Sequence, residues 1–298
     1  MSITPVWDRL VRFVSTDGRV LCGQPIDPDV DVGLALASGQ PLEAQVLSGA
    51  SALDDADFTG EVAIIQKLLS PISASEVGTI RCIGMNYRDH AAELNLPIPK
   101  VPEVFMKPSN CLHNPSDPVI LPQSASDAVD AEVELAVVIG RDCKDVAAED
   151  ALDYVLGYTV ANDITARDVQ SQILQWGYCK GYDGFCPLGP ALVSARALPD
   201  PSVLALKTTL DGQTLQDGSA SDMIFTVPEI IEYLSRDTTL PKGTVILTGT
   251  PSGIGHSYQP PRYMKEGSNL RISITPGLGT LTNAIASGAK GAKTQPRL

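Results

Sequence analysis

Asp130-Ala-Glu-Val-Glu-Leu-Ala-Val-Val-Ile-Gly140 is an apolar, β-branched run that ends at a glycine. This pattern predicts a β-strand. Because side chains alternate across a strand, Glu132 and Glu134 lie on one face and point the same way. Two neighbouring carboxylates repel each other unless a positive charge lies between them. A hard cation with oxygen ligands suits that position, so we predict a site for Mg²⁺, with Mn²⁺ and Ca²⁺ as alternatives.

A third carboxylate follows in Gly157-Tyr-Thr-Val-Ala-Asn-Asp-Ile-Thr-Ala-Arg-Asp-Val-Gln170. Residues 155–161 predict a strand and residues 164–176 a helix, so Asp163 lies at the junction, where an acidic residue favours a helix start. Arg167 and Gln170 lie four and seven residues later, on the helical face of Asp163. A metal ligand, a guanidinium and an amide would then face one place. The simpler alternative is a solvated strand edge followed by a helix cap.

Six short motifs follow one another along residues 76–285. In chain order they are Ile83-Gly-Met-Asn-Tyr-Arg-Asp-His-Ala-Ala-Glu93, Phe105-Met-Lys-Pro-Ser109, Glu132-Val-Glu134, Asn162-Asp-Ile-Thr-Ala-Arg-Asp-Val-Gln170, Lys180 to Gly189, and Thr248-Gly-Thr-Pro-Ser-Gly-Ile-Gly255. Together they resemble the fumarylacetoacetate hydrolase family, specifically its shorter domain-containing branch. The resemblance implies an α+β fold that is mainly β: a mixed β-roll catalytic domain after a small N-terminal β domain, commonly as a homodimer. It also implies three metal ligands, Glu132, Glu134 and Asp163.

His90 and Glu93 lie three residues apart in a segment expected to be helical, so their side chains are neighbours. A carboxylate beside an imidazole fixes its tautomer and raises its basicity, which is the chemistry of a general base. An exposed histidine in an ordinary helix ion pair is the simpler alternative, but the resemblance implies a catalytic dyad. Residues 94–102 are rich in proline and cannot continue a helix, so we expect a short mobile lid that orders over ligand.

The resemblance and the spacing also assign residues that contact an anionic substrate. The expected substrate-binding residues are Lys107, Arg167, Gln170 and Thr250. Thr250 lies in a glycine loop after a predicted strand, where its hydroxyl and the backbone N–H groups can be offered to a carboxylate. Lys180 is the third expected catalytic residue, because the resemblance places it at the substrate's carboxylate or developing enolate. Asp183 is expected to orient Lys180.

The charge of the chain restricts its partners. The 298 residues include 22 Lys and Arg against 35 Asp and Glu, a formal net charge of −13. This balance argues against nucleic acid and anionic membranes, which need basic patches. We expect a small anionic oxo acid as substrate, drawn in by local cations and metal against the field of the whole protein.

The cysteines and the N-terminus indicate a compartment. The six cysteines show no C-x-x-C spacing, and residues 1–10 contain no apolar segment of a signal peptide. No apolar run approaches the ~20 residues that a membrane span needs. Free thiols fit a reducing compartment, so we expect a cytoplasmic protein, with a mitochondrial location as the alternative.

The chain divides into three predicted segments: residues 1–75 as a small N-terminal β domain, 76–285 as the catalytic domain and 286–298 as a flexible tail. Within the first segment, Asp17 and Gly18 predict a hairpin turn. Residues 33–37 and 62–69 predict further strands. Thr226 predicts the start of a helix with an apolar face.

Three functions remain open at this point. The first is hydrolysis of a carbon–carbon bond in a 1,3-diketo acid such as an acylpyruvate or fumarylpyruvate, with the dyad activating water. The second uses the same metal site as an oxaloacetate decarboxylase or oxaloacetate tautomerase, since family members do each of these. The third is a non-catalytic binding protein on the same fold, against which the intact candidate residues argue.

Overall fold

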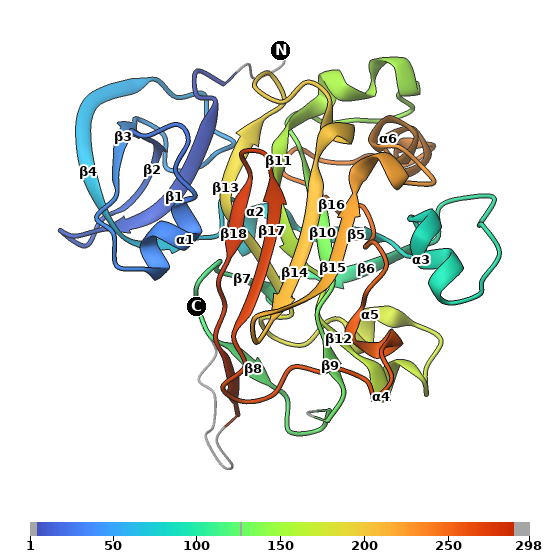
Figure 1. Ribbon diagram of the computed structural model, residues 1–298. Helices are drawn as coiled ribbons and strands as arrows, with labels where there is room; N and C mark the ends of the chain where they lie inside the picture. The colour runs from blue at the N-terminus through green and yellow to red at the C-terminus, as the bar shows by residue number, and fades with distance from the viewer. Residues whose placement is uncertain (1–4, 126, 289–298) are drawn as a thin grey trace.

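The computed structural model describes residues 5–125 and 127–288, and its largest feature is an eleven-stranded mixed sheet (Figure 1). In spatial order its strands are β2 (Val20–Pro25), β3 (Glu43–Leu47), β4 (Phe58–Leu69), β1 (Arg9–Ser15), β13 (Cys186–Ser194), β11 (Val155–Asn162), β10 (Val133–Ile139), β16 (Val245–Leu247), β5 (Thr79–Ile83) and β6 (Val104–Pro108), with β7 (Leu112–His113) also paired to β13. Most neighbours are antiparallel, but β16–β5 and β13–β7 are parallel. The predicted α+β fold that is mainly β is confirmed.

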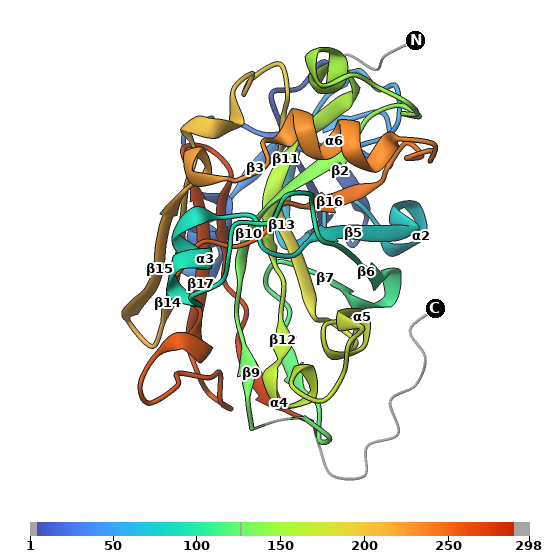
Figure 2. The same cartoon turned by 90° about the vertical axis from the view of Figure 1, so that its right-hand side faces the viewer.

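Three smaller sheets complete the β structure. Four strands form one of them, in the order β15 (Gln213–Ser219), β14 (Ala205–Leu210), β17 (Leu270–Thr275) and β18 (Gly279–Leu281). The other two are strand pairs: β9 (Val129–Asp130) with β12 (Thr165–Ala166), and β8 (Val119–Leu121) with β19 (Ile285–Ser287). The β9–β12 pair lies below the large sheet in Figure 2, next to α4.

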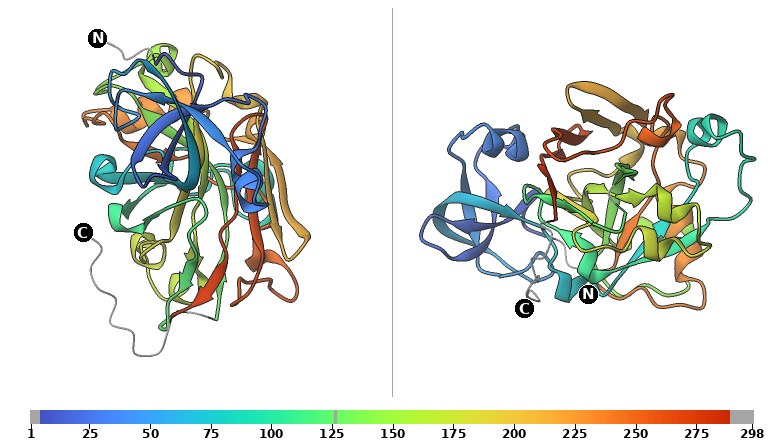
Figure 3. Two further views of the ribbon diagram at one scale, coloured as in Figure 1. Left: turned by 90° about the vertical axis from the view of Figure 1, so that its left-hand side faces the viewer. Right: turned by 90° about the horizontal axis from the view of Figure 1, so that it is seen from below.

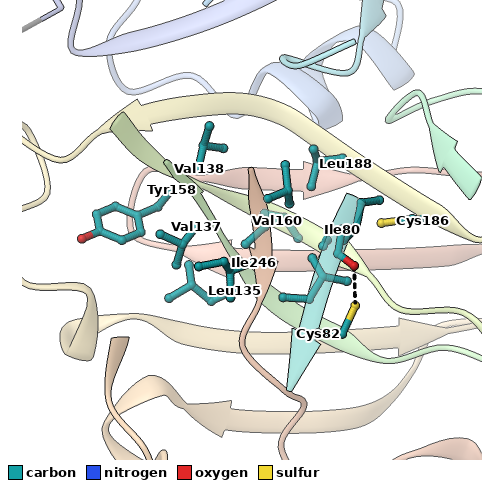
Figure 4. Close-up of a cluster of buried hydrophobic side chains, with 14 of the residues drawn as sticks. Ile80, Cys82, Leu135, Val137, Val138, Tyr158, Val160, Cys186, Leu188 and Ile246 are labelled. Atoms are coloured by element: carbon teal, nitrogen blue, oxygen red, sulfur yellow. Dashed lines mark hydrogen bonds between the residues drawn. The ribbon is translucent and has the colours of Figure 1, made fainter. Parts of the chain in front are cut away.

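The main core lies around the central strands of the large sheet. Every residue of β10 and of β11 is buried, and both strands are rich in β-branched residues. Because both faces of these strands are covered, they read as continuous apolar runs rather than as alternating ones. Figure 4 shows this packing. The labelled side chains are Ile80, Cys82, Leu135, Val137, Val138, Tyr158, Val160, Cys186, Leu188 and Ile246.

The α-helices are short: α1 (Val32–Ala37), α2 (Ala74–Val77), α3 (Arg88–Glu93), α4 (Arg167–Gln170), α5 (Trp176–Cys179) and α6 (Val227–Ser235). The described residues also include five short 3₁₀ helices between other elements: η1 (Ser109–Cys111), η2 (Ala148–Tyr154), η3 (Pro201–Val203), η4 (Ala220–Asp222) and η5 (Gly255–Ser257). The predicted start of α6 is confirmed, because the side chains of Thr226 and Glu229 form a capping box. Figure 2 shows α3 beside the four-stranded sheet.

The N-terminal strands lie together at the left of Figure 1 and in both views of Figure 3. Most side chains of a second buried hydrophobic cluster come from these strands and α1. The hairpin predicted at Asp17 and Gly18 joins β1 to β2, and residues 62–69 belong to β4. The strand predicted at residues 33–37 is wrong. These residues form α1, because the Asp31 carboxylate caps the N–H groups of Gly33 and Leu34 and starts a helix instead.

The boundary at residue 75 stays a prediction. Strand β1 pairs with β2 and β4 on one side of this boundary but also with β13, so the sheet runs on from one predicted domain into the next. The predicted tail, 286–298, begins inside strand β19, and residues 289–298 lie outside the described residues. In the part of the chain that the structure describes, no helix has the length and apolar character needed to cross a membrane.

The helix predicted over residues 164–176 is also wrong. Residues 165–166 pair as β12 with β9, and only residues 167–170 and 176–179 are helical. Tertiary pairing with Val129 and Asp130 therefore overrides local helix propensity. Asp163 lies before this helix, so Asp163, Arg167 and Gln170 do not share one helical face.

Candidate metal and catalytic site

Three carboxylates meet where strands β10 and β11 adjoin. Glu132 directly precedes β10 and Glu134 lies within it, while Asp163 directly follows β11. Oxygen atoms of the three side chains lie within 4.8 Å of one another, and all three residues are buried. The antiparallel pairing of Val133 with Asn162 brings the two chain segments together. The structure thus assembles the predicted metal ligands from positions thirty residues apart.

Glu134 provides the test of whether this group fits a cation. Its carboxylate accepts the N–H of Gly249 at 2.8 Å. Burial raises the pKa of Glu134 well above its ordinary value, and the charges of Asp163 and Glu132 raise it further. Three buried oxygen donors crowded in this way match the ligand set that hard divalent cations take. The residues therefore fit a divalent metal ion.

Lys180 joins two of the three carboxylates. Its ammonium donates to Asp163 at 2.6 Å, to Glu132 at 2.9 Å and to the Thr165 hydroxyl at 2.7 Å. Burial alone would lower the pKa of Lys180, but Asp163 and Glu132 raise it above its ordinary value, which keeps the amine charged. Lys180 is therefore a fixed cation beside the acidic group. Asp183, expected to orient Lys180, instead accepts a hydrogen bond from the Asn110 amide.

Lys107 lies on the opposite side of Asp163. Its side chain is fully buried, and its ammonium donates to Asp163 at 2.6 Å, to the Phe185 carbonyl at 2.8 Å and to the Ile164 carbonyl at 3.5 Å. A lysine ammonium has three N–H groups, and these three acceptors use all of them, so none is left to donate to a substrate. These contacts favour a role for Lys107 in orienting Asp163.

Arg167 binds carboxylates of the protein itself. Its Nη2 donates to Glu132 at 2.5 Å, its Nε donates to Asp130 at 2.9 Å, and its Nη1 donates to the Gln170 amide oxygen at 3.0 Å. Burial opposes ionisation of Glu132, but Lys180 and Arg167 more than offset it and lower its pKa to about 2. Arg167 is therefore close to the candidate metal ligands through its bond to Glu132, and Gln170 is close to them through its bond to Arg167.

The two residues of the predicted dyad lie on α3 with their side chains in hydrogen-bonding contact. The Nδ1 atom of His90 lies 2.8 Å from a carboxylate oxygen of Glu93, and the other oxygen accepts the N–H of Gly253 at 2.8 Å. Burial alone would raise the pKa of Glu93, but these two hydrogen bonds hold it below its ordinary value. An ionised carboxylate at Nδ1 favours the imidazole tautomer whose Nε2 is free to accept a proton. His90 itself is 6% exposed, so it is no ordinary surface histidine.

The glycine loop, residues 248–256, binds carboxylates as expected, but they belong to the protein. Besides the N–H groups of Gly249 and Gly253, those of Gly255 and His256 donate to Asp130 at 2.9 and 3.0 Å. The Thr250 hydroxyl is buried and donates to the Val133 carbonyl at 2.8 Å. The loop therefore positions site residues.

Two buried polar residues beside the site, Asp130 and Gln216, were not identified from the sequence. Asp130 is 1% exposed and accepts from Arg167, from the backbone N–H of Ala131 and from the end of the glycine loop. The sequence did contain a signal for Asp130, because Glu132 and Glu134 follow it at i+2 and i+4 and strand alternation places all three side chains on one face. Gln216 lies in a surface hairpin, and nothing in its sequence surroundings distinguishes it.

The chain is similar to a known protein family and to enzymes of that family. Residues 79–286 match the family described as fumarylacetoacetate (FAA) hydrolase C-terminal. A caffeoylpyruvate hydrolase of Neonothopanus nambi is 38% identical over 290 residues, which cover 95% of this chain and 94% of the relative. The oxaloacetate tautomerase YisK of Bacillus subtilis (strain 168) is 44% identical over 221 residues, which cover 74% and 73%.

A solved structure extends the likeness to the fold. The 2-hydroxyhepta-2,4-diene-1,7-dioate isomerase of Mycobacterium marinum is 35% identical, with a TM-score of 0.78 over 95% of this chain and all of that one. The family match, residues 79–286, includes the three carboxylates and α3. The chain therefore belongs to the fumarylacetoacetate hydrolase family of enzymes.

Proposed function

We propose that the protein is a divalent-metal-dependent hydrolase that cleaves the carbon–carbon bond of an acylpyruvate. The observation that carries this proposal is the hydrogen bond of 2.8 Å between His90 and Glu93 on α3. The glycine loop donates a backbone N–H to Glu93 and another to Glu134, so it links this pair to the candidate metal ligands. The near full-length similarity to a caffeoylpyruvate hydrolase supports it. A small anionic oxo acid is then the substrate.

The reaction consumes one water molecule. Water adds to the acyl carbonyl carbon of R–CO–CH₂–CO–COO⁻, and Nε2 of His90 takes a proton from it. The bond between the acyl carbon and the methylene carbon breaks, and its electron pair passes to the pyruvate enolate. The proton held by His90 then reaches the methylene carbon. The products are the acid R–COOH and pyruvate.

Each charged residue has a separate task in this scheme. Glu93 accepts the Nδ1–H of His90 and stabilises the imidazolium that forms. Lys180 offers a positive charge near the developing enolate. Glu132, Glu134 and Asp163 would hold the divalent ion, Mg²⁺ or Mn²⁺, which when bound supplies a Lewis acid and a template for the oxo-acid oxygens.

Arg167 and Lys107 act on the ligands in this proposal. Arg167 orients Glu132 through Nη2, and Lys107 orients Asp163 through a bond of 2.6 Å. This assignment replaces the substrate contacts expected from the sequence, because both side chains are engaged with carboxylates of the protein. The mobile lid at residues 94–102, the homodimer and the compartment stay predictions.

The proposal is tested by assaying acylpyruvates that differ in the acyl group in H₂¹⁸O, with Mg²⁺, with Mn²⁺ and with EDTA. We expect equal amounts of pyruvate and of an acid that carries one ¹⁸O atom from water, and no turnover with EDTA. The absence of hydrolysis for every acylpyruvate, with oxaloacetate turned over instead, would contradict the proposal.

A tautomerase of oxaloacetate is the second candidate, favoured by the 44% identity with the oxaloacetate tautomerase. That reaction needs proton transfer at carbon but neither water addition nor bond cleavage. In D₂O it would introduce deuterium at the C3 carbon of oxaloacetate without forming pyruvate. Decarboxylation, the third reaction open to this site, would form pyruvate and CO₂ from the same substrate.

A further inference from the structure

Gln216 is a buried amide in the β14–β15 hairpin whose four polar positions are all bonded. Its oxygen accepts the Val133 N–H at 3.0 Å and the Thr208 hydroxyl at 2.8 Å. Its nitrogen donates to the Thr250 hydroxyl at 2.7 Å and to the Pro251 carbonyl at 2.9 Å. A side-chain amide can make four hydrogen bonds, so this one is fully used.

These bonds join two segments that carry the site. Val133 lies between the glutamates 132 and 134, while Thr250 and Pro251 lie in the middle of the glycine loop. On either side of that pair, Gly249 donates to Glu134 and Gly253 donates to Glu93, each at 2.8 Å. The amide therefore holds the loop between its contact with a candidate metal ligand and its contact with the dyad.

The backbone of the hairpin is packed against the loop with no room to spare. A Cβ atom added at Gly218 would lie 2.4 Å from the Pro251 Cβ atom. One added at Gly253 would lie 2.1 Å from the Leu215 carbonyl oxygen. The hairpin and the loop thus form one packed unit, with Gln216 at its polar centre.

We propose that Gln216 is a positioning residue that fixes the glycine loop on β10, and through the loop sets Glu134 and Glu93 relative to each other. A small shift of residues 250–251 would displace both carboxylates at once. Substrate does not contact Gln216 in this scheme, so its loss affects the rate and the affinity for metal and leaves KM nearly unchanged. The inference rests on the proposed function, because it requires the metal ligands and the His90–Glu93 dyad to act in one reaction.

Two buried threonines provide a matched test, because each is bonded to Gln216 from a different side. Thr250→Val removes the bond to Gln216 on the loop side together with the bond from Thr250 to the Val133 carbonyl, and Thr208→Val removes the bond on the hairpin side; Gln216→Met isolates the contribution of the amide. We expect Thr250→Val and Gln216→Met to lower kcat by about 10-fold or more, as outer-shell changes do. Their affinity for Mn²⁺, measured by titration calorimetry, should fall by about 10-fold as well.

The controls separate positioning from general loss of stability. Thr208→Val should lower the melting temperature but keep kcat and the Mn²⁺ affinity within about 2-fold of wild type, since the loop keeps its bonds to the Gln216 nitrogen. Thr250→Ser keeps the hydroxyl and should restore both quantities. If Gln216→Met does not fold, the comparison of Thr250→Val with Thr208→Val decides alone.

The inference is overturned if Thr250→Val and Thr208→Val change kcat equally, or if Thr250→Val changes only KM, which would make its hydroxyl a substrate contact. Failure of the proposed function is distinguishable, because the wild type would then hydrolyse no acylpyruvate, or Glu93→Gln and Asp163→Ala would keep its hydrolase activity. If those two variants are inactive while the threonine pair behaves alike, only the role of Gln216 is wrong.

Discussion

Strands β10 and β11 have two halves of opposite character. In the apolar half, Leu135 is paired with Val160 and Val137 with Tyr158, and all four side chains are buried (Figure 4). The charged half begins one residue away, and its buried ionisable side chains are those of Lys107, Asp130, Glu132, Glu134, Asp163, Arg167 and Lys180. The core and the site thus adjoin at one end of this strand pair, where Glu134 lies on β10 and Asp163 follows β11.

The two halves differ in what burial does to stability. Each apolar side chain gains about 1.5–3 kcal/mol when it leaves water. Each buried ion instead loses several kcal/mol of hydration free energy, and its ion-pair partners offset this loss only in part. Proteins in which well-packed apolar residues replace such a pair are often as stable or more stable. The apolar half is therefore explained by stability. The charged half needs a functional explanation, and the predictions below probe this contrast.

Asp163→Ala should have the largest effect on stability. The substitution leaves the buried ammonium groups of Lys107 and Lys180, each 2.6 Å from an Asp163 oxygen, without this counter-charge. Breaking a buried pair from one side costs about 3–5 kcal/mol in the free energy of unfolding. Urea denaturation measures this, with the exposed Asp153→Ala as matched control. An equal, small loss in both variants would show that the charged half is not coupled in this way.

His90→Ala should remove activity and also lower the free energy of unfolding, because His90 is buried and bonded to Glu93 at 2.8 Å. Loss of a general base costs on the order of 10²-fold or more in kcat for acylpyruvate hydrolysis and for oxaloacetate tautomerisation. Decarboxylation of oxaloacetate should suffer less, because polarisation by the metal ion contributes most to that reaction. Equal losses in all three reactions would mean that His90 does not act as a base on water.

Arg167→Met should reduce metal affinity by about 10–100-fold, which is the usual effect of removing a partner from a ligand. The reason is that its Nη2 holds Glu132 at 2.5 Å while its Nε is anchored on Asp130 at 2.9 Å. Arg167→Lys should not restore the affinity, since an ammonium lacks the planar fork that bridges two carboxylates. Calorimetric titration with Mn²⁺ measures both variants.

An unchanged metal affinity together with a raised KM would return Arg167 to the substrate-binding role expected from the sequence. Exposed Lys144→Met removes a positive charge far from the carboxylates that Arg167 bonds and is the control for loss of charge alone.

Ile246→Val should have the smallest effect and confine it to stability. Ile246 is fully buried against the apolar half, where it is paired with Val137. Removing one methylene from such a site costs about 0.5–1.5 kcal/mol. Thermal melting should show this loss while kcat and metal affinity stay at wild-type values. A change in kcat beyond about 2-fold would mean that the two halves are not energetically separate.

The sequence predicts the apolar half better than the charged half. The apolar runs at residues 130–140 and 155–161 predicted strands, which the structure has as β10 and β11, because strand patterns depend mainly on neighbouring residues. The acidic group followed from the alternation of Glu132 and Glu134 and from the family resemblance at Asp163. The helix predicted after Asp163 failed because pairing with β9, thirty-five residues upstream, decides the conformation of residues 165–166.

The partners of the charged residues could not be predicted in the same way. Sequence reasoning expected Lys107, Arg167 and the glycine loop to bind an anion, and each does so in the structure. The anions are Asp163, Glu132 and Glu134, because the chain folds its own carboxylates against these donors. Which carboxylate reaches a given donor depends on tertiary packing, and residues such as Gln216 have no local signature at all.

Titration of the metal-free protein with Mn²⁺, followed by calorimetry, tests the central claim that the charged half is a metal centre. We expect one ion per chain in the wild type and no measurable binding to Glu134→Gln, because that carboxylate is crowded by Glu132 and Asp163 and has no lysine or arginine partner among the described ion pairs. Wild-type binding by Glu134→Gln, or a wild-type protein that binds no ion, would contradict the account.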